Sequence, residues 1–253
     1  MTHAIGVDFG ATGIKAALVD CASGELLSDR LRVDTPSPAT PAAVRDAISG
    51  LVARFEPAPV GVAVPAVVQH GVVRSAANID DSWIGTSLPA LLDAAIGVPT
   101  AYLNDADAAG LAEASFGSAR DHRGLVVVVT IGTGIGTALL YDGRLVPNAE
   151  LGHLELDGVE AELIGSGRAL ERSGCAWDAW TGVVSRYLQH LEALLWPDLI
   201  VIGGGVASTP EHWFPHLRAR TPLRLATHGK SAGLVGAAHA VATLTTHPSG
   251  VTP

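Results

Sequence analysis

The chain has 253 residues, of which 48% are hydrophobic and 16% are charged. It can bury a substantial core, and its length suits one large domain or two modest ones. Acidic residues outnumber basic ones by 25 to 16, which gives a formal net charge of −9. This balance excludes a general nucleic-acid-binding protein, so any bound anion must be held by backbone amides, a metal ion and a few cations.

The apolar runs and the cysteines indicate the cellular location of the protein. No stretch approaches the roughly 20 apolar residues that a membrane helix needs, and a strand begins almost at once, so no signal peptide is predicted. Cys21 and Cys175 lie far apart and form no metal-binding spacing. We therefore expect a cytoplasmic protein with no membrane partner and no zinc.

The first half of the chain predicts strands and helices in alternation. A glycine turn follows the first strand, and Thr40-Pro41 opens a helix with apolar residues at helical spacing. The predicted elements are strands over 4–8, 14–20, 25–33, 60–65 and 100–103, a helix from Thr40, and a helix from Asn104-Asp105 to Phe116.

The pattern of strand, glycine turn and strand returns downstream. The run VDFGATGIKAALVD, from Val7, aligns without a gap with VTIGTGIGTALLYD, from Val129, at an offset of 122 residues (129 minus 7). Two copies of a domain-sized unit predict two similar lobes. The remaining predicted elements are strands over 125–130, 137–141, 144–147 and 199–202, a long helix stopped by Pro197, and an Ala- and Gly-rich helix over 232–243 that packs tightly on a sheet.

Both glycine turns are candidate phosphate loops, because such turns expose several amides to one anion. A dinucleotide-binding fold needs a glycine turn that leads into a helix, whereas both turns here lead into strands. The sequence GxxxxGK[ST] is absent, which excludes a P-loop. A glycine-turned hairpin at the start of each lobe is instead what an actin-like nucleotide clamp uses. Hairpin turns without a ligand remain the alternative.

Two polar positions stand at predicted strand ends. Asp8 adjoins the first turn, where its carboxylate would repel phosphate unless Mg²⁺ lay between them, held mostly through water; the alternative is an Asp that caps its own turn. Asn104-Asp105 stands where a strand meets a helix. There Asp105 could accept a hydroxyl proton while Asn104 fixes the substrate, or the pair could simply cap the helix.

Acidic residues and one histidine follow the second hairpin. Glu150 and His153 resemble a metal pair, but one histidine without cysteine makes zinc a poor interpretation. Hydrogen bonding to vicinal hydroxyls is the better use, with Glu160 and Glu162 as further acceptors.

These motifs together resemble a known family. The chain carries Asp8-x-Gly10, then N-D-A-D-A from Asn104, then G-T-G-I-G from Gly132, then Glu150-x-Gly152-His153, in that order. This order is similar to that of sugar kinases of the ROK (repressor, open reading frame, kinase) family, over roughly residues 4–243. The runs HGVVRSAANIDDSWIGT, PNAELGHLE and WPDLIVIGGG further resemble its polyphosphate glucokinase subgroup.

The resemblance implies an α/β, actin-like (ASKHA, ribonuclease H-like) two-lobed kinase fold with an internal duplication. Residues 1–104 with 229–247 would form the small lobe, and 105–228 the large one. The implied reaction moves a phosphoryl group from polyphosphate or ATP, with Mg²⁺, to the 6-hydroxyl of glucose, with mannose as a further candidate acceptor. A homodimer is implied as well.

The resemblance also implies residue roles. Asp105 would be the catalytic base. The implied sugar-binding residues are Asn78, Asn104, Asp105, Glu150, His153 and Glu162. The implied phosphate- or nucleotide-binding residues are Asp8, Gly10, Thr12, Gly13, Lys15, Gly132, Thr133, Gly134, Gly203, Gly204 and Gly205.

The sequence departs from the family pattern at several points. The CxCGxxGC zinc motif is absent, the first loop reads Gly-Ala-Thr-Gly where Gly-Gly-Ser-Gly is usual, and Ala66 stands where the pattern has Gly. The segment over 207–212 lacks basic residues. One rival within the family is a strictly ATP-dependent hexokinase. A sugar-sensing regulator is disfavoured, since no room for a DNA-binding helix pair precedes the first strand.

Overall fold

The structure is a computed structural model that describes residues 3–77 and 79–246. It divides into two compact units: unit 1 comprises residues up to Ala112 together with those from Ser231 onward, and unit 2 comprises Glu113–Lys230. Helix α3 (Asp105–Phe116) spans the first boundary. No helix among the described residues is long and apolar enough to cross a membrane.

The boundaries of the units differ from the predicted ones, which lay after residue 104 and before residue 229. The difference arises because the first half of α3 packs within unit 1. There Ala108 forms a small cluster with Ala63 and Ala237, three fully buried alanines from three different elements. The chain therefore leaves unit 1 inside a helix instead of at the end of the preceding strand.

Unit 1 is built on a five-stranded sheet in the order β3-β2-β1-β4-β7. The first three strands pair antiparallel, whereas β4 and β7 run parallel to β1. The strands are β1 (His3–Phe9), β2 (Gly13–Asp20), β3 (Leu31–Asp34), β4 (Val60–Val64) and β7 (Thr100–Asn104). Two short strands, β5 (Val68–Gln69) and β6 (Val72–Val73), form a separate hairpin, and a 3-10 turn spans Asp81–Trp83.

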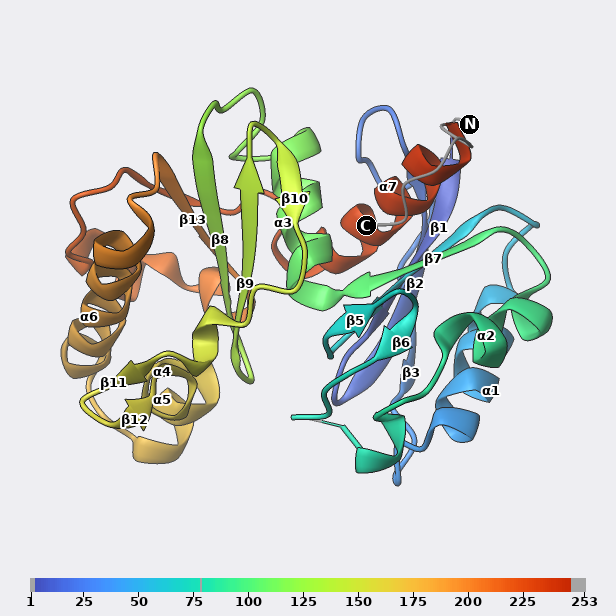
Figure 1. Cartoon of the computed structure of the whole chain (residues 1–253), viewed down its shortest axis with the longest axis horizontal. Helices are drawn as coiled ribbons and strands as arrows, with labels where there is room; N and C mark the ends of the chain where they lie inside the picture. The colour runs from blue at the N-terminus through green and yellow to red at the C-terminus, as the bar shows by residue number, and fades with distance from the viewer. Residues whose placement is uncertain (1–2, 78, 247–253) are drawn as a thin grey trace. The chain divides into compact units, whose positions relative to one another are not determined.

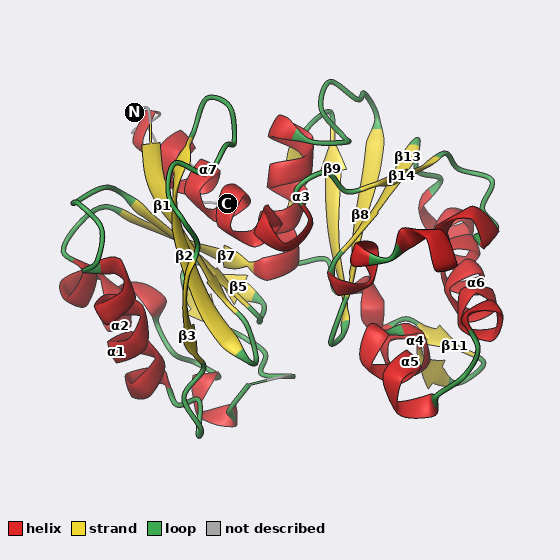
Figure 2. Cartoon of the chain, turned by 180° about the vertical axis from the view of Figure 1, so that it is seen from behind, coloured by secondary structure: helices red, strands yellow, loops and turns green. Residues whose placement is uncertain are grey.

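Helices cover both faces of this sheet (Figures 1 and 2). Helices α1 (Pro41–Val52) and α2 (Leu88–Ile96) lie on one face, and α7 (Ala232–Thr246) lies on the other. A Cβ on Gly61 of β4 would come within 1.8 Å of the Ala237 carbonyl oxygen, so α7 rests directly on the strand backbone. The predicted tight packing of an Ala- and Gly-rich helix is thereby confirmed.

Unit 2 repeats the plan with a sheet in the order β10-β9-β8-β13-β14. Its long helix α6 (Trp177–Leu195) buries Trp180, Tyr187 and Leu188 against the sheet. The strands are β8 (Leu125–Ile131), β9 (Ile135–Tyr141), β10 (Arg144–Val146), β13 (Leu199–Gly203) and β14 (Leu223–Leu225). Outside the sheet are the hairpin of β11 (Glu155–Leu156) and β12 (Val159–Glu160), helices α4 (Ala161–Gly165) and α5 (Gly167–Ser173), and short 3-10 turns.

The two sheets confirm the internal duplication and correct its alignment. In unit 1 the residues that flank the glycine turn pair as Phe9 with Ile14, and in unit 2 they pair as Ile131 with Ile135. The second turn is therefore one residue shorter, since three residues instead of four separate the paired positions. The offset of 122 holds up to the turn and becomes 121 beyond it (135 minus 14), so the gapless alignment was wrong for the second strand.

Glu113, the first residue of unit 2, has a side chain that is fully buried. Its carboxylate accepts hydrogen bonds from the backbone amides of Ser118 (2.8 Å), Thr227 (3.0 Å) and His228 (2.9 Å). These three donors satisfy a charge that would otherwise be costly to bury. The carboxylate thus links the end of α3 to the segment along which the chain leaves unit 2.

Candidate active site

The first glycine turn is fixed by hydrogen bonds to its carbonyl groups. The Gly10 amide donates to the Gly13 carbonyl (3.1 Å), the Thr35 hydroxyl donates to the Gly10 carbonyl (2.6 Å), and Arg32 donates to the Thr12 carbonyl (2.9 Å). The acceptors of the turn are thus engaged by its own unit. A turn held in this way has the fixed backbone that a phosphate loop needs to present amides to an anion.

Asp8 and Lys15 face each other across this hairpin. They are cross-strand partners, and the Lys15 Nζ lies 2.9 Å from the Asp8 Oδ2, with side chains 31% and 17% exposed. The Asp8 carboxylate also adjoins the first turn of α7, near Gly233. Because Asp8 is a single carboxylate already paired with Lys15, it fits a Mg²⁺ ion only as a partner of the metal's water shell and not as part of a closed metal site, which needs more ligands. Among the described residues, no group of three or more His, Cys, Asp or Glu could hold a metal ion.

The second glycine turn meets the triple glycine. The Gly132 amide donates to the Gly134 carbonyl (2.9 Å), and the Gly132 carbonyl accepts from the Arg168 amide (3.2 Å). Gly204 has φ +84°, and a Cβ there would lie 2.4 Å from the Ile131 carbonyl oxygen, so only glycine fits. The structure therefore packs Gly204 against Ile131 and Gly205 beside Gly132, and it pairs Gly203 with Thr130, so the triple glycine and the start of the second turn form one glycine-lined surface of unit 2.

Asn104 caps helix α3. Its Oδ1 accepts from the amides of Ala106 (2.8 Å) and Asp107 (3.1 Å), and its Nδ2 donates to the Ala66 carbonyl (3.2 Å). The residue is only 5% exposed. The capping alternative therefore describes what the Asn104 side chain does in this structure, and its role in sugar binding stays a prediction. Ala66, which departs from the family pattern, supplies the carbonyl that holds the amide.

Asp105 is the first residue of α3 and follows β7 directly. Its Oδ1 accepts from the Ala106 amide (2.8 Å), which orients the carboxylate at the helix N-terminus. A carboxylate is stabilised there by the orphan amides and the helix dipole. The position suits a fixed proton acceptor, and the catalytic role itself stays a prediction.

The segment that carries Glu150 is fastened to β9. The buried Thr137 hydroxyl donates to the Ala149 carbonyl and accepts from the Leu151 amide (3.0 Å), so both neighbours of Glu150 are held by one side chain. A Cβ on Gly152 would come within 2.0 Å of the Ile135 carbonyl oxygen. Gly152 thus lets the 3-10 turn over Leu151–His153 lie directly against the strand that leaves the second glycine turn.

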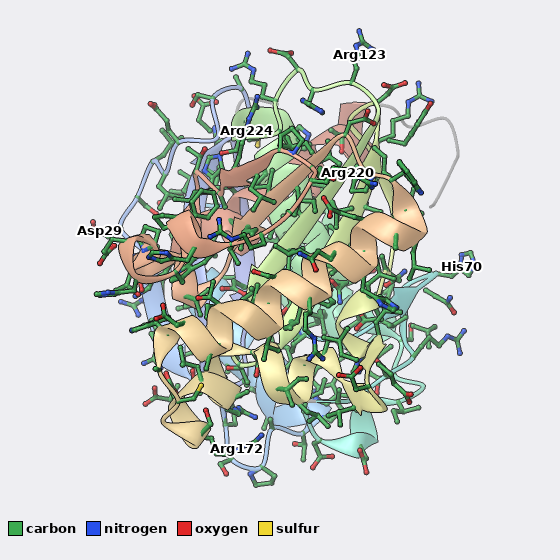
Figure 3. All side chains as sticks on the ribbon, turned by 90° about the vertical axis from the view of Figure 1, so that its left-hand side faces the viewer. Asp29, His70, Arg123, Arg172, Arg220 and Arg224 are labelled. Carbon is green, nitrogen blue, oxygen red and sulfur yellow. The ribbon has the colours of Figure 1, made fainter. Side chains whose placement is uncertain are left out.

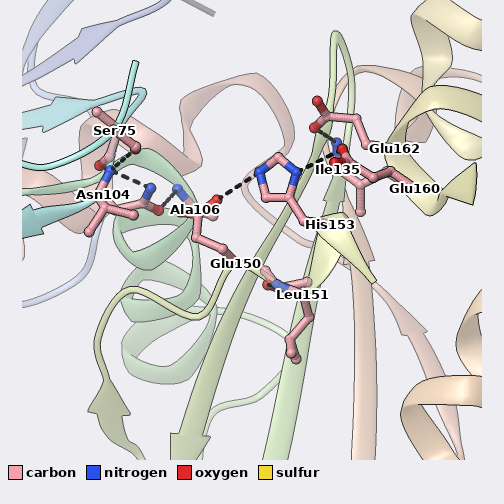
Figure 4. Close-up of polar contacts among 12 residues, drawn as sticks. Ser75, Asn104, Ala106, Ile135, Glu150, Leu151, His153, Glu160 and Glu162 are labelled. Atoms are coloured by element: carbon pink, nitrogen blue, oxygen red, sulfur yellow. Dashed lines mark hydrogen bonds and ion pairs between the residues drawn. The ribbon is translucent and has the colours of Figure 1, made fainter. Parts of the chain in front are cut away.

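His153 lies between two carboxylates (Figure 4). Its Nδ1 is 3.1 Å from the Glu160 Oε2, and its Nε2 is 3.7 Å from the Glu150 Oε2. The hydrogen bond with Glu160 is the main cause that raises the pKa of His153, against the effect of burial, and the charges of Glu162, Glu160 and Glu150 add to it. Burial is the main cause that raises the pKa of Glu150.

Glu162 joins the same group from α4. Its Oε2 accepts from the Ile135 amide (2.8 Å), directly beside the second glycine turn. Unit 2 therefore brings Glu150, His153, Glu160 and Glu162 together, as acceptors suited to the hydroxyls of a sugar. Thr137, which orients this group, was missed because a threonine in a strand gives no local signal of a site. Asn78, a predicted sugar-binding residue, lies outside the described residues.

Two sheets of the same order, each opening with a glycine-turned hairpin, define the actin-like class of phosphotransferase folds. Within that class the chain belongs to the ROK family, whose family model matches residues 4–177. Polyphosphate glucokinase of Mycobacterium tuberculosis (strain ATCC 25618 / H37Rv) is 45% identical over 247 residues, which covers 97% of this chain and 93% of that protein.

Two solved structures extend the comparison. The inorganic polyphosphate/ATP-glucomannokinase from Arthrobacter sp. strain KM is 49% identical and superposes with a TM-score of 0.93, covering 96% of this chain and 99% of that one. A ROK family glucokinase from Streptomyces griseus, solved in complex with glucose and AMPPNP, is 26% identical with a TM-score of 0.81, covering 95% of this chain and 99% of that one.

Proposed function

We propose that this protein is a glucokinase that transfers a phosphoryl group from inorganic polyphosphate to the 6-hydroxyl of glucose, with ATP as a second donor. The names of the relatives at 45% and 49% identity support this reaction. The observation that carries the proposal is structural. One unit holds the charged glycine hairpin and Asp105, and the other holds a glycine-lined surface beside a group of sugar-type acceptors.

The reaction assigns a role to each group. Glu150, His153 and Glu162 accept hydrogen bonds from the sugar hydroxyls, and Glu160 orients His153. Asp105 takes the proton of the 6-hydroxyl while that oxygen bonds to the terminal phosphorus of the donor. The bond from phosphorus to the bridging oxygen breaks, and the shortened polyphosphate, or ADP, leaves with the electron pair. Positioning and charge supply most of the rate in such transfers.

The donor is held by the amides of the two glycine turns and by Lys15. Asp8 would hold a Mg²⁺ ion, mostly through water, and the ion would supply positive charge to neutralise the phosphate oxygens. We further propose that mannose is a second acceptor, that the protein is cytoplasmic and that it forms a homodimer. The alternative function is that of a strictly ATP-dependent hexokinase.

A donor panel tests the proposal. Formation of glucose 6-phosphate is measured with long-chain polyphosphate, tripolyphosphate, ATP and GTP, each with glucose and with mannose. We expect turnover with polyphosphate and a poorer rate with ATP. Turnover with ATP and none with polyphosphate of any length would leave the hexokinase alternative.

A further inference from the structure

A groove of about 580 Å³ runs along the outer face of α6 in unit 2. One wall is formed by six residues on one face of α6, between Asp178 and Gln189. The other wall is formed by His216 and Arg218. The residues used below are Thr181, Ser185, Arg186, Gln189, His216 and Arg218, which we call the α6 groove.

The walls of the α6 groove are joined to each other. The Arg218 amide donates to the Ser185 hydroxyl (3.0 Å), and Gln189 donates to the Arg218 carbonyl (3.1 Å). The chain segment that carries Arg218 is therefore held to α6 by two hydrogen bonds. The groove is thus a fixed feature of unit 2 and not a gap beside a loose loop.

Hydrogen-bond donors dominate the lining. Arg186 and Arg218 contribute guanidinium groups, and among the described residues Arg218 forms no ion pair. Thr181 is 3% exposed, and its hydroxyl has no hydrogen-bond partner within the described part of the chain. Asp157 pairs with Arg186 (2.6 Å), and Asp178 lies at the lining, so the cationic end of the groove is the one at Arg218.

The cationic character extends beyond the groove. From His212 to Pro253 the sequence contains no Asp or Glu, although the chain as a whole has a formal net charge of −9. Figure 3, which looks onto α6, shows Arg220 and Arg224 on one side of the helix. The segment that forms the second wall begins, along the chain, at the triple glycine of the candidate active site.

We propose that the α6 groove binds a segment of the polyphosphate chain away from the phosphoryl group that reacts. The inference rests on the proposed function. Guanidinium forks match phosphate oxygens two at a time, which suits a repeating phosphate chain. A long donor has phosphates to spare beyond those held at the glycine turns, whereas tripolyphosphate and ATP do not. The groove therefore sets a preference for long donors.

The test uses Arg218→Gln, with Arg172→Gln as the matched control, because it removes the same charge from an exposed position of the same unit. We expect the KM for long-chain polyphosphate to rise about tenfold in Arg218→Gln, the usual effect of one charge-assisted contact. The KM values for tripolyphosphate, ATP and glucose should not move. Arg218→Lys should recover part of the loss, and salt should raise the KM for long chains most in the wild type.

Each other outcome overturns the inference. Unchanged KM values for all donors in Arg218→Gln would show that the groove binds no donor. An equal rise for long and short donors, or an equal effect of Arg172→Gln, would show a general effect of charge. If the wild type uses ATP only, polyphosphate is not a donor and the proposed function is wrong. A calorimetric titration with long-chain polyphosphate then tests separately whether the α6 groove binds it. Equal binding to wild type and Arg218→Gln would overturn the inference.

Discussion

The two glycine hairpins share a backbone plan and differ in what surrounds them. In unit 1 the paired positions next to the turn are Asp8 and Lys15, which form an ion pair, whereas the equivalent pair in unit 2 is Thr130 and Gly136. The unit 2 turn is instead enclosed by backbone, since Gly204 lies directly against Ile131. Duplication has thus kept the hairpin in both copies, with an ion pair beside the first turn and, beside the second, close backbone packing and the carboxylate of Glu162.

The largest expected effect is on kcat and concerns Asp105, which lies in neither hairpin. Asp105→Asn keeps the size of the side chain and removes its ability to take a proton. We expect kcat to fall by about 10²–10⁴-fold, the usual contribution of a general base, with glucose binding and stability retained. Single-turnover kinetics and a glucose titration check this. A near-normal kcat would identify Asp105 as a helix-start residue only.

The second prediction tests close packing around the unit 2 turn. Gly204→Ala places a Cβ against the Ile131 backbone at φ +84°. We expect the free energy of unfolding to fall by about 3 kcal/mol, from backbone strain and overpacking together. The control is Gly143→Ala, where φ is +76° but nothing lies within 4 Å, so it should cost only about 1 kcal/mol. Equal losses in denaturant titrations would show that crowding is unimportant.

The third prediction tests the charge beside the unit 1 turn. Asp8→Asn should raise the Mg²⁺ concentration for half-maximal rate about tenfold, because a neutral amide orders the metal's water less well. Stability should change by no more than about 1 kcal/mol, since the ion pair with Lys15 is partly exposed. Thr130→Val, at the equivalent position of unit 2, should leave the Mg²⁺ dependence unchanged. A similar shift in both variants would contradict the proposed difference.

The smallest expected effect concerns His153, which belongs to the charged group beside the unit 2 turn. The pKa of His153 is raised in the folded protein, so its contribution to stability is full below about pH 6.5 and is lost as pH rises through the raised value. At 41% exposure the contribution should stay below about 1 kcal/mol. Wild type should exceed His153→Gln in unfolding free energy at about pH 5.5 and match it at about pH 8.5. A constant difference would exclude titration of His153.

Elements with a strong local pattern could be predicted from the sequence. The two hairpins, the helix from Pro41, helix α3 and the long α6 all agree with expectation, since their apolar spacing and turn residues act locally. Helix α2 was missed although Ser87 caps it and Gly97 ends it in the left-handed region. Its nine residues are nearly all apolar and its buried residues are only Leu88 and Leu92, so the run is too short and too uniform for the period to stand out.

Other differences arise from contacts between distant residues. The predicted strand over 25–33 pairs only from Leu31, apart from one bridge at Leu26, because the Ser28 hydroxyl takes the Leu18 amide. A glutamate in a helix predicts a solvated side chain. Glu113 is instead buried, and it accepts hydrogen bonds from Thr227 and His228, more than 100 residues further along the chain. The motifs identified Glu150 and His153, whereas only the fold shows that Thr137 holds their segment.

The discontinuity of unit 1 has a consequence for synthesis on the ribosome. The sheet of unit 1 is complete once Asn104 has been made, but the helix that covers one of its faces begins at Ala232. The 127 residues between the two parts (231 minus 104) need about 6–25 s at the usual rates of elongation. Throughout that time the alanine- and glycine-lined face of β1 and β4 stays uncovered, because α7 has not yet been made, while all of unit 2 is synthesised. A nascent chain should therefore bury unit 2 before it closes unit 1.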